Sequence, residues 1–600
     1  MTTKNVLGIK IVGHDPGAAL ISGERFVAIS EERLNRIKYS TGLFPHLSIS
    51  YCLDALNLKA SDIDLIVMDA VGEFDEEQVL TRFKRENNLT FPNAEIKVIN
   101  HHLAHAASAF FCSPFQEAAI MVVDGAGSKT ITTQGEFIET ETLYHGEGAE
   151  MCEVQKTRHP VFRSRYPYTF GIGKLYTFIT RRVLSFGLYN EGKTMGLSSY
   201  GDAKNIYRII PKERWMKELS GDFLCNPKIT YPGFGSFSFR RFFRDPRKVL
   251  INYGVLLLEF LGDIRMRFTK NGSGRKNIFS PIHIPFPPRP EKAPLPEKDY
   301  NDVAAVVQDI IEDIFLGLSR KAHAATNSKN LCIAGGCGLN GVSNNKILHD
   351  KRFREIFIQP ASSDTGIPLG CALWGVHTFF KEPRRFVMRD AYLGCIYPEE
   401  KILEALKETK GITFRKSENI AKEAAQLIAE GKIVGWFQFG AEYGPRSLGA
   451  RSILADARNP EMKNILNVRV KHREMWRPFA ASVLKEKANK YFELDYPESP
   501  FMLLVPKIRE EAKKDMPSLV HIDSTCRIQT VTKEDNGIFY DLIKAFDEET
   551  GVPLIINTSF NLAGEPIIET PEDALRCFLS TDMDYLVLGS YVVKKDQNTV

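Results

Sequence analysis

The sequence predicts an α/β protein built from more than one domain. Short runs of β-branched residues alternate along the chain with segments of helical spacing, a pattern typical of strands covered by helices. Two of these strands are followed by an aspartate and small residues, at Asp124 and Asp364, which indicates a duplicated fold around a nucleotide cleft. With 600 residues, of which 43% are hydrophobic, the chain is too long for one core and suggests two or three domains.

The composition argues against several classes of partner. The formal net charge is +4, which is small for this length, so bulk electrostatics favours neither nucleic acid nor a membrane surface. The ten cysteines are scattered without a CxxC pair, which fits buried thiols in a reducing compartment. The first residues enter a strand rather than a signal sequence, and the apolar run from Val255 to Leu261 is too short to cross a bilayer. We therefore expect a cytoplasmic protein.

The N-terminus predicts a hairpin with a polar turn. Residues 6–12 form a buried strand, and GHDPGAAL then turns into a second strand, FVAISEER. His14 and Asp15 lie in this turn between Gly13 and Pro16. Such a pair either shapes the turn or faces a phosphate, metal or hydroxyl in a cleft, and the sequence leaves both readings open.

Residues 94–128 predict a strand, a helix and a second strand. The β-branched runs 96–99 and 120–123 flank the small-residue segment 103–111, which has helical propensity. Asp124 ends the second strand. The turn after it is made of small residues whose backbone N–H groups could approach a phosphate, with Gly125, Gly127 and Ser128 as the candidate nucleotide contacts.

Two histidines open this helix. His101 and His105 are four residues apart, so they share one face and could bind one metal ion. If the two flanking strands are parallel neighbours, Asp124 meets both histidines at the carboxyl ends of the strands. A lone histidine is more often a satisfied polar group beside a core, but the pair together with a strand-terminal aspartate favours a metal or substrate site.

Glycine-rich segments further along the chain indicate more ligand contacts. The segment 189–201, YNEGKTMGLSSYG, reads as a loop near a ligand. Residues 205–300 read as an insertion that ends in a proline-rich connector, and a long amphipathic helix follows at 301–326. Residues 331–348 then predict a strand, a glycine turn and a helix beside a nucleotide. The candidate nucleotide contacts here are Lys193, Gly335, Gly336 and Asn340.

A change of composition at 381–390 predicts a domain boundary, and the second domain carries a basic cluster. Its arginines are interleaved with Gly, Pro, Ser and aromatic residues rather than with acids, which favours a small phosphorylated ligand. Nucleic acid is the alternative, but no extended basic stripe or stacking array surrounds the cluster. Single asparagines here could instead form tight Asx turns. The candidate ligand contacts are Arg446, Arg451, Lys471, Arg477, Arg527, Asn557, Ser559 and Asn561.

Taken together, these segments resemble the O-carbamoyltransferases of the NodU/CmcH type. NHHLAHAASAF, VVDGAG, AGGCGLN, SSDTG, GAEYGPRSLGARSILADAR, REMWRPFA and NTSFN follow the family's order over nearly the whole chain. The resemblance implies an ASKHA-type (actin-like ATPase) carbamoyl-transfer domain at 1–380, with the insertion at about 205–300. It also implies a YrdC-like domain at 391–600 that forms carbamoyl-adenylate.

The resemblance also implies an activity. Carbamoyl phosphate and ATP, the latter with Mg²⁺, would give carbamoyl-adenylate and pyrophosphate at the basic cluster. The carbamoyl group would then pass to a hydroxyl of a small natural product, with His14 as general base beside Asp15. A divalent metal, Fe²⁺ by resemblance, would be held by His101, His105, Asp124 and Asp364, and the protein would form a homodimer. The acceptor alcohol stays open.

Three other functions compete with this one. A tRNA threonylcarbamoyl-transfer protein would share the histidine pair and the glycine turns, but the fused arginine-rich domain and the near-neutral charge argue against it. A sugar kinase of the same superfamily would not need the histidine pair. A non-enzymatic nucleotide-binding scaffold would bind ATP but would release no pyrophosphate when carbamoyl phosphate is added.

Overall fold

The structure is a computed structural model. It describes residues 4–72, 74–133, 135–160, 170–219, 221–230, 280, 282–290, 296–496 and 498–596. The apolar run at 255–261 and much of the predicted insertion at 205–300 lie outside these residues. Within the described part of the chain, no helix is long and apolar enough to span a bilayer.

The first sheet is built around the N-terminal strand β1. Its strand order is β3-β2-β1-β4-β5, with the two hairpin pairs antiparallel and the pairs β1–β4 and β4–β5 parallel. The predicted polar turn is present and joins β1 to β2, while a second hairpin, through a strand β2 that was not predicted, joins β2 to β3. The bounds are β1 Asn5–Lys10, β2 Gly17–Ser22, β3 Arg25–Ser30, β4 Leu65–Ala70 and β5 Glu95–Asn100.

The second sheet repeats the same plan. It runs β15-β14-β6-β8-β7, with β9 paired to β8; β6 is antiparallel to β8 and parallel to β14. The duplication inferred from the two aspartates is therefore real, and the strand order is that of the actin-like ATPase fold. The bounds are β6 Glu117–Val123, β7 Lys129–Thr132, β8 Gly135–Glu147, β9 Glu150–Pro160, β14 Asn330–Ala334 and β15 Glu355–Ile358.

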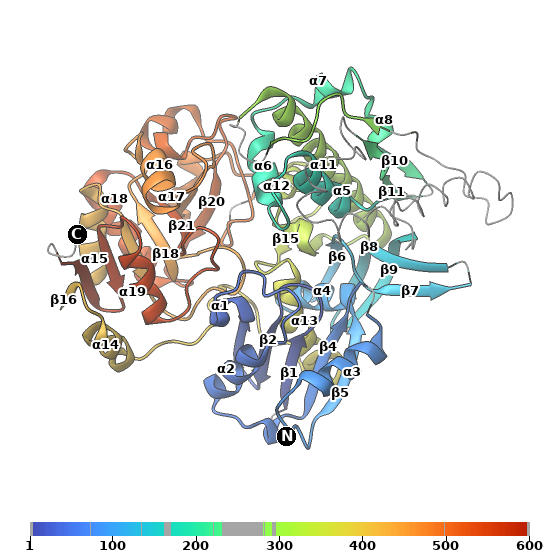
Figure 1. The fold of residues 1–600 in the computed structure, drawn as a ribbon, viewed down its shortest axis with the longest axis horizontal. Helices are drawn as coiled ribbons and strands as arrows, with labels where there is room; N and C mark the ends of the chain where they lie inside the picture. The colour runs from blue at the N-terminus through green and yellow to red at the C-terminus, as the bar shows by residue number, and fades with distance from the viewer. Residues whose placement is uncertain are drawn as a thin grey trace, which may run out of the picture.

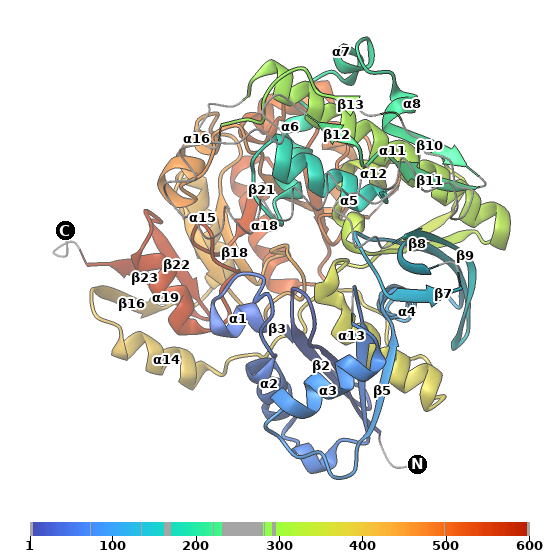
Figure 2. The same ribbon diagram turned by 45° about the vertical axis from the view of Figure 1, so that its right-hand side comes forward.

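Two helices lie between these sheets. α13 (Ile367–Trp374) packs on β1, α4 (His101–Phe110) packs on β14 and β6, and the two helices pack against each other (Figure 2). This layering corrects one expectation. The strands on either side of α4 are not neighbours in one sheet, because β5 belongs to the first sheet and β6 to the second. It is α4 that brings ligands from both sheets together.

Helices also cover the outer faces of the N-terminal part. On the first sheet, α2 (His46–Leu56) packs on β2 and β3, and α3 (Glu76–Glu86) packs on β4 and β5. The predicted amphipathic helix is α11 (Lys298–Thr326), which contacts β6 and the helices α6 (Glu191–Ser198) and α12 (Gly341–His349). The segment around Lys193, predicted as a loop, is therefore helical.

The C-terminal part contains one mixed sheet of eight strands (Figure 1). The strand order is β16-β23-β22-β17-β18-β21-β19-β20, and α14 (Glu399–Glu408), α15 (Ile420–Ala429), α18 (Gly537–Thr550) and α19 (Pro571–Leu579) accompany it. The strands are β16 Ile412–Lys416, β17 Val434–Phe437, β18 Arg451–Ala455, β19 Ala480–Leu484, β20 Arg527–Val531, β21 Leu554–Ser559, β22 Tyr585–Leu588 and β23 Tyr591–Lys595.

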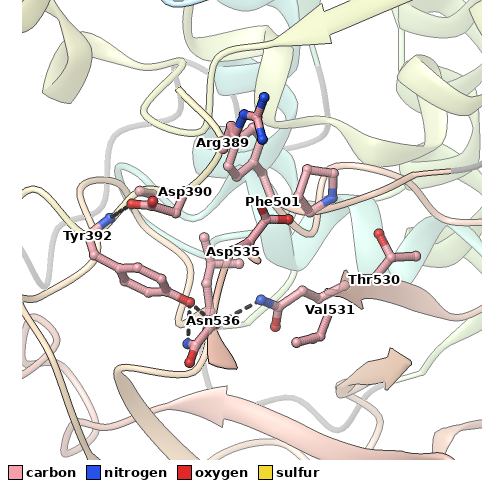
Figure 3. A pocket seen from close by; sticks show the side chains of 12 residues that line it. Arg389, Asp390, Tyr392, Phe501, Thr530, Val531, Asp535 and Asn536 are labelled. Atoms are coloured by element: carbon pink, nitrogen blue, oxygen red, sulfur yellow. Dashed lines mark hydrogen bonds between the residues drawn. The ribbon is translucent and has the colours of Figure 1, made fainter. Parts of the chain in front are cut away.

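The segment that joins the two parts is fixed at its C-terminal end. The Tyr392 hydroxyl donates to the Leu448 carbonyl at 2.7 Å and accepts from the Asn536 amide at 2.6 Å, beside a cavity of about 20 Å³, which is room for one water molecule (Figure 3). The apolar core continues across the junction, because Trp476 and Phe501 are buried in the same cluster as residues of the N-terminal sheets. The two parts therefore share a core.

Candidate functional site

Four side chains from separate elements converge near α4. Asn100 ends β5, and its side chain caps α4 by accepting from the Leu103 N–H, which places His101 and His105 in the first turns of the helix. Asp124 directly follows β6, and Asp364 begins a short 3₁₀ turn after β15. One potential ligand atom from each of His101, His105, Asp124 and Asp364, here called the metal cluster, lies within 4.8 Å of all the others.

The distances inside the metal cluster suit one ion. His101 Nε2 lies 3.7 Å from Asp124 Oδ2 and 3.6 Å from Asp364 Oδ1, while His105 Nε2 lies 3.7 Å from Asp364 Oδ1. Ligand atoms about 2.1 Å from one ion are about 3–3.5 Å apart, so only a small contraction would close the shell. Both histidines are buried, and neither Nε2 has a hydrogen-bond partner among the described residues. These buried acceptors fit a divalent transition metal with mixed N and O ligands.

Two residues that the sequence analysis missed lie behind this cluster. Asp69 Oδ2 accepts from Nδ1 of His101 at 2.7 Å, and Lys10 Nζ lies 3.0 Å from Asp364 Oδ2. Burial alone would raise the pKa of Asp364, but Lys10, His14 and His101 hold it well below its ordinary value. The available signal was a charged residue at the end of each of two apolar strands, β1 and β4.

His14 and Asp15 reach the same place from the turn after β1. His14 Nδ1 lies 3.1 Å from Asp15 Oδ2, and its Nε2 lies 3.7 Å from Asp364 Oδ2. Asp15 has φ of 54° and its N–H donates to the Tyr39 carbonyl, which holds the turn in place. Burial lowers the pKa of His14, but Asp364 and Asp15 outweigh it and raise that pKa to about 9.

The turn after Asp124 uses its polar groups within the protein. The N–H of Gly127 donates to the Glu139 carbonyl and the N–H of Ser128 to the Glu139 carboxylate. The Ser128 hydroxyl accepts from the N–H of His101 and donates to the Ala70 carbonyl. These contacts tie the turn to the start of α4, so a nucleotide contact through Gly127 or Ser128 would require them to open. Nucleotide binding by Gly125 stays a prediction.

The glycine turn after β14 also supports the metal cluster. The N–H of Gly336 donates to Asp124 Oδ1 at 3.0 Å. Gly335 has φ of 89°, and a side chain there would collide with the Val123 backbone, so only glycine fits between the two strands. The Asn340 side chain caps α12 by accepting from the N–H of Ser343. A nucleotide contact for these residues stays a prediction.

A second group of residues gathers in the C-terminal part. Arg446, Lys471, Arg477 and Arg527, here called the basic cluster, come from loops and strand ends around β18, β20 and β21. Burial lowers the pKa of Arg446, and the neighbouring Arg527 and Arg477 lower it further. Burial and Arg477 likewise lower the pKa of Arg527 to about 10. Cations that depress one another's pKa in a partly buried place favour an anionic ligand.

Lys471 joins two of the predicted polar residues to this cluster. Its Nζ donates to Asn561 Oδ1 at 2.6 Å and to the Ser559 carbonyl at 2.7 Å. Burial holds the pKa of Lys471 well below its ordinary value, and Arg473 adds to the effect. The structure thus brings Lys471, Ser559 and Asn561 together after β21, as the order of strand and polar residues predicted.

Two predicted contacts belong to the interior of the sheet instead. Arg451 is fully buried, stacks on the Phe437 ring with its guanidinium carbon 3.6 Å from the ring centre, and donates to the carbonyls of Gln438, Phe439 and Glu569. The backbone therefore uses Nε and Nη1 of Arg451, whereas its buried Nη2 has no partner among the described residues, and the phosphate-fork role stays a prediction. Asn557 is also buried, and its amide group bonds Ser447, Ser482 and Gln529 within the sheet.

Comparison with known proteins decides the family. The family model described as Carbamoyltransferase N-terminus matches residues 5–92 and 88–373. The model described as Carbamoyltransferase C-terminus matches residues 425–595. The chain belongs to the carbamoyltransferase family. It is 32% identical to nodulation protein NolNO of Sinorhizobium fredii, over 97% of this chain and 79% of that protein. It is 34% identical to nodulation protein NolO of Bradyrhizobium diazoefficiens, over 83% of this chain and 79% of that protein.

One solved structure shows a weaker likeness to this carbamoyltransferase. HypF from T. kodakarensis is 11% identical, covers 64% of this chain and 48% of its own, and superposes with a TM-score of 0.33. A score this low carries no argument about the site. The resemblance to the carbamoyltransferases is thus confirmed by the family matches, and the chain is an enzyme of that class.

The two clusters of this carbamoyltransferase face the junction between its parts. The ring of Tyr189 lies 4.8 Å from that of His14 and 4.4 Å from that of Tyr39. Tyr39 is close enough to Arg477 to influence its pKa. Lys193 bridges the junction through an ion pair with Glu474 at 2.8 Å, and its predicted contact with a nucleotide stays a prediction. A short path of side chains therefore connects His14 to the basic cluster.

Proposed function

We propose that this carbamoyltransferase activates the carbamoyl group with ATP and then transfers it to an alcohol. The atoms of the first reaction balance only if one water molecule is consumed. Water cleaves carbamoyl phosphate to carbamate and phosphate; a carbamate oxygen then attacks the α-phosphorus of ATP, and pyrophosphate leaves. The product is carbamoyl-adenylate. The observation that supports this reaction most strongly is the basic cluster. Of its four cations, Arg477 has a carboxylate nearby, Glu474 at 3.8 Å, and the excess of positive charge suits a phosphate and a triphosphate held together.

In the second reaction an acceptor hydroxyl attacks the carbamoyl carbon of the adenylate, and AMP leaves. His14 is the proposed general base, with Asp15 orienting its ring through Nδ1. A general base must be neutral to accept a proton, and the charge of the metal cluster affects the pKa of His14. A divalent metal bound there, Fe²⁺ by family resemblance, would offset the Asp364 charge that raises the pKa of His14 and could also polarise the adenylate phosphate. The acceptor would be a hydroxylated small natural product.

One experiment tests the first reaction. The purified chain is incubated with Mg²⁺–ATP, with and without carbamoyl phosphate, and pyrophosphate is measured. We expect release that depends on carbamoyl phosphate and is matched by formation of carbamoyl-adenylate or its hydrolysis product AMP. Release of pyrophosphate at the same rate without carbamoyl phosphate, or release of ADP in its place, would contradict the proposal.

A further inference from the structure

A buried lysine and aspartate close a ring behind the metal cluster. Lys10 ends β1, and Asp69 lies beside it on β4, one step beyond the register pair of Ile9 and Met68. Both side chains have no exposed surface. Their Nζ and Oδ2 atoms are 3.6 Å apart; Lys10 then contacts Asp364, and Asp69 contacts His101. The ring therefore passes through two of the four metal ligands.

Each member of the pair controls the orientation of one ligand. Lys10 Nζ lies 3.0 Å from Oδ2 of Asp364, which turns Oδ1 toward Nε2 of both histidines in the cluster. Asp69 is an acceptor, so Nδ1 of His101 must carry the proton it shares, and Nε2 is left to bind a metal. Partners of this kind fix the tautomer and the ring orientation of a metal ligand.

The pair also sets the charge of the site. The buried groups Asp69, Asp124, Asp364 and Lys10 are three carboxylates and one ammonium, so two negative charges remain when the histidines are neutral. One divalent cation balances that charge, and the burial of charges is tolerated only when they are paired. Because Lys10 and Asp69 have opposite charges, removing both leaves the charge of the site unchanged.

We propose that Lys10 and Asp69 are positioning residues that orient Asp364 and His101 for a divalent cation, an inference that rests on the metal site proposed above. They act through the ligands and do not touch the ion. The alternative is that the pair serves only to balance charge. The two cases predict different results for substitutions that keep the shape of the side chains.

The test measures equilibrium affinity for Co²⁺ by chelator competition, together with the visible absorption of the bound Co²⁺, which reports the geometry of its ligands. If the pair positions ligands, Lys10→Met and Asp69→Asn should each weaken binding about 10- to 100-fold. The double variant should also bind weakly and show an altered spectrum. If the pair only balances charge, the Lys10→Met variant should bind Co²⁺ more tightly than the wild type. The double variant should then have the affinity and the spectrum of the wild type.

A matched control comes from the other end of the same strands. Lys4 and Asp64 form an ion pair at 3.1 Å beside the start of β1, with about a third of each side chain exposed. Lys4→Met with Asp64→Asn should leave the affinity and the spectrum unchanged. Melting curves identify any variant that does not fold; if the double variant is lost, Lys10→Met still decides, and if Lys10→Met is lost, the affinity and spectrum of the double variant decide. If the wild type binds no Co²⁺, the metal site itself fails; if all variants bind as the wild type does, only the positioning role fails.

Discussion

The metal cluster and the basic cluster are made of opposite kinds of atoms. The first offers buried acceptors, two imidazole nitrogens without partners and two carboxylates of low pKa, and a lysine and an aspartate hold them from behind. The second offers buried donors whose pKa values are depressed by burial and by one another. A site rich in carboxylate repels polyphosphate, whereas the basic cluster attracts it. Formation of pyrophosphate and transfer to an alcohol are therefore better served by two separate sites.

The largest expected effect concerns the metal cluster alone. His105→Ala removes one of four ligands, and we expect the variant to lose most of the approximately one transition metal per chain that the wild type should carry. Elemental analysis after desalting measures this. His145→Ala is the control, because His145 pairs with Glu117 outside the cluster. Equal metal content in wild type and His105→Ala would refute the site.

The next test separates the two clusters by activity. Arg527→Ala should lower the release of pyrophosphate that depends on carbamoyl phosphate by about 100- to 1,000-fold, which corresponds to about 3–4 kcal/mol of lost transition-state stabilisation. His14→Ala should leave that release intact and abolish transfer to the acceptor. Added carbamoyl-adenylate should restore product with Arg527→Ala and not with His14→Ala.

Arg320→Ala is the matched control for this comparison, because Arg320 pairs with Asp350 on the exposed surface. It should change neither step. If Arg527→Ala and His14→Ala lose pyrophosphate release equally, or if added adenylate restores neither, the division of labour between the clusters is wrong.

A comparison of stability tests whether Arg451 is a structural residue outside the basic cluster. Arg451→Ala leaves three buried carbonyls without their donor, so it should lower the free energy of unfolding by roughly 3 kcal/mol or more. Arg527→Ala removes a cation that its neighbour Arg477 repels, and its melting temperature should stay near or above that of the wild type. Thermal melting compares the two variants. A larger loss of stability in Arg527→Ala would reverse their assignments.

Glu141 gives the smallest effect; it is a buried acid on the N-terminal side whose pKa is raised, whereas those of Asp124 and Asp364 are lowered. Burial raises the pKa of Glu141 to about 8, although the Thr140 hydroxyl and the Ile172 N–H bond the carboxylate. A raised folded pKa gives stability that is fully present below the unfolded value near 4.5 and is lost as pH rises through about 8. Each pH unit in that window should cost the wild type up to about 1.4 kcal/mol.

Glu141→Gln keeps the shape of the side chain and cannot ionise. Its melting temperature relative to that of the wild type should therefore rise between pH 5.5 and pH 8. Glu153→Gln, a partly exposed glutamate on β9, provides the control. A constant difference between Glu141→Gln and the wild type across this range would show that Glu141 is already ionised in the folded chain.

The metal cluster was predictable because its signals are local. The spacing of His101 and His105 on a helix and the position of Asp124 directly after a strand need no knowledge of the tertiary fold. The four side chains converge although β5 and β6 belong to different sheets. Lys10 and Asp69 were missed because each acts on a ligand far along the chain. Only the pairing of β1 with β4, and the helix layer between the sheets, brings them there.

The members of the basic cluster were harder to predict from the sequence. Arg451 and Arg477 lie in similar surroundings in the sequence, yet one stacks inside the sheet on Phe437 and the other faces the junction. Which way a strand residue points depends on register, and β18 was not foreseen as a strand that begins at Arg451. The domain boundary at 381–390, the homodimer, the cytoplasmic location and the identities of nucleotide, metal and acceptor stay predictions.

The core shared across the junction has a consequence for engineering. Trp476 and Phe501 of the C-terminal part are buried together with residues of the N-terminal sheets. The Arg33 guanidinium, from the N-terminal part, is buried and donates to the carbonyls of Glu442 and Gly444. A fragment that began near residue 391 would expose this apolar surface to water and would tend to aggregate. The halves of such enzymes therefore cannot be exchanged as cassettes between relatives, unless the surfaces that meet at the junction are transplanted with them.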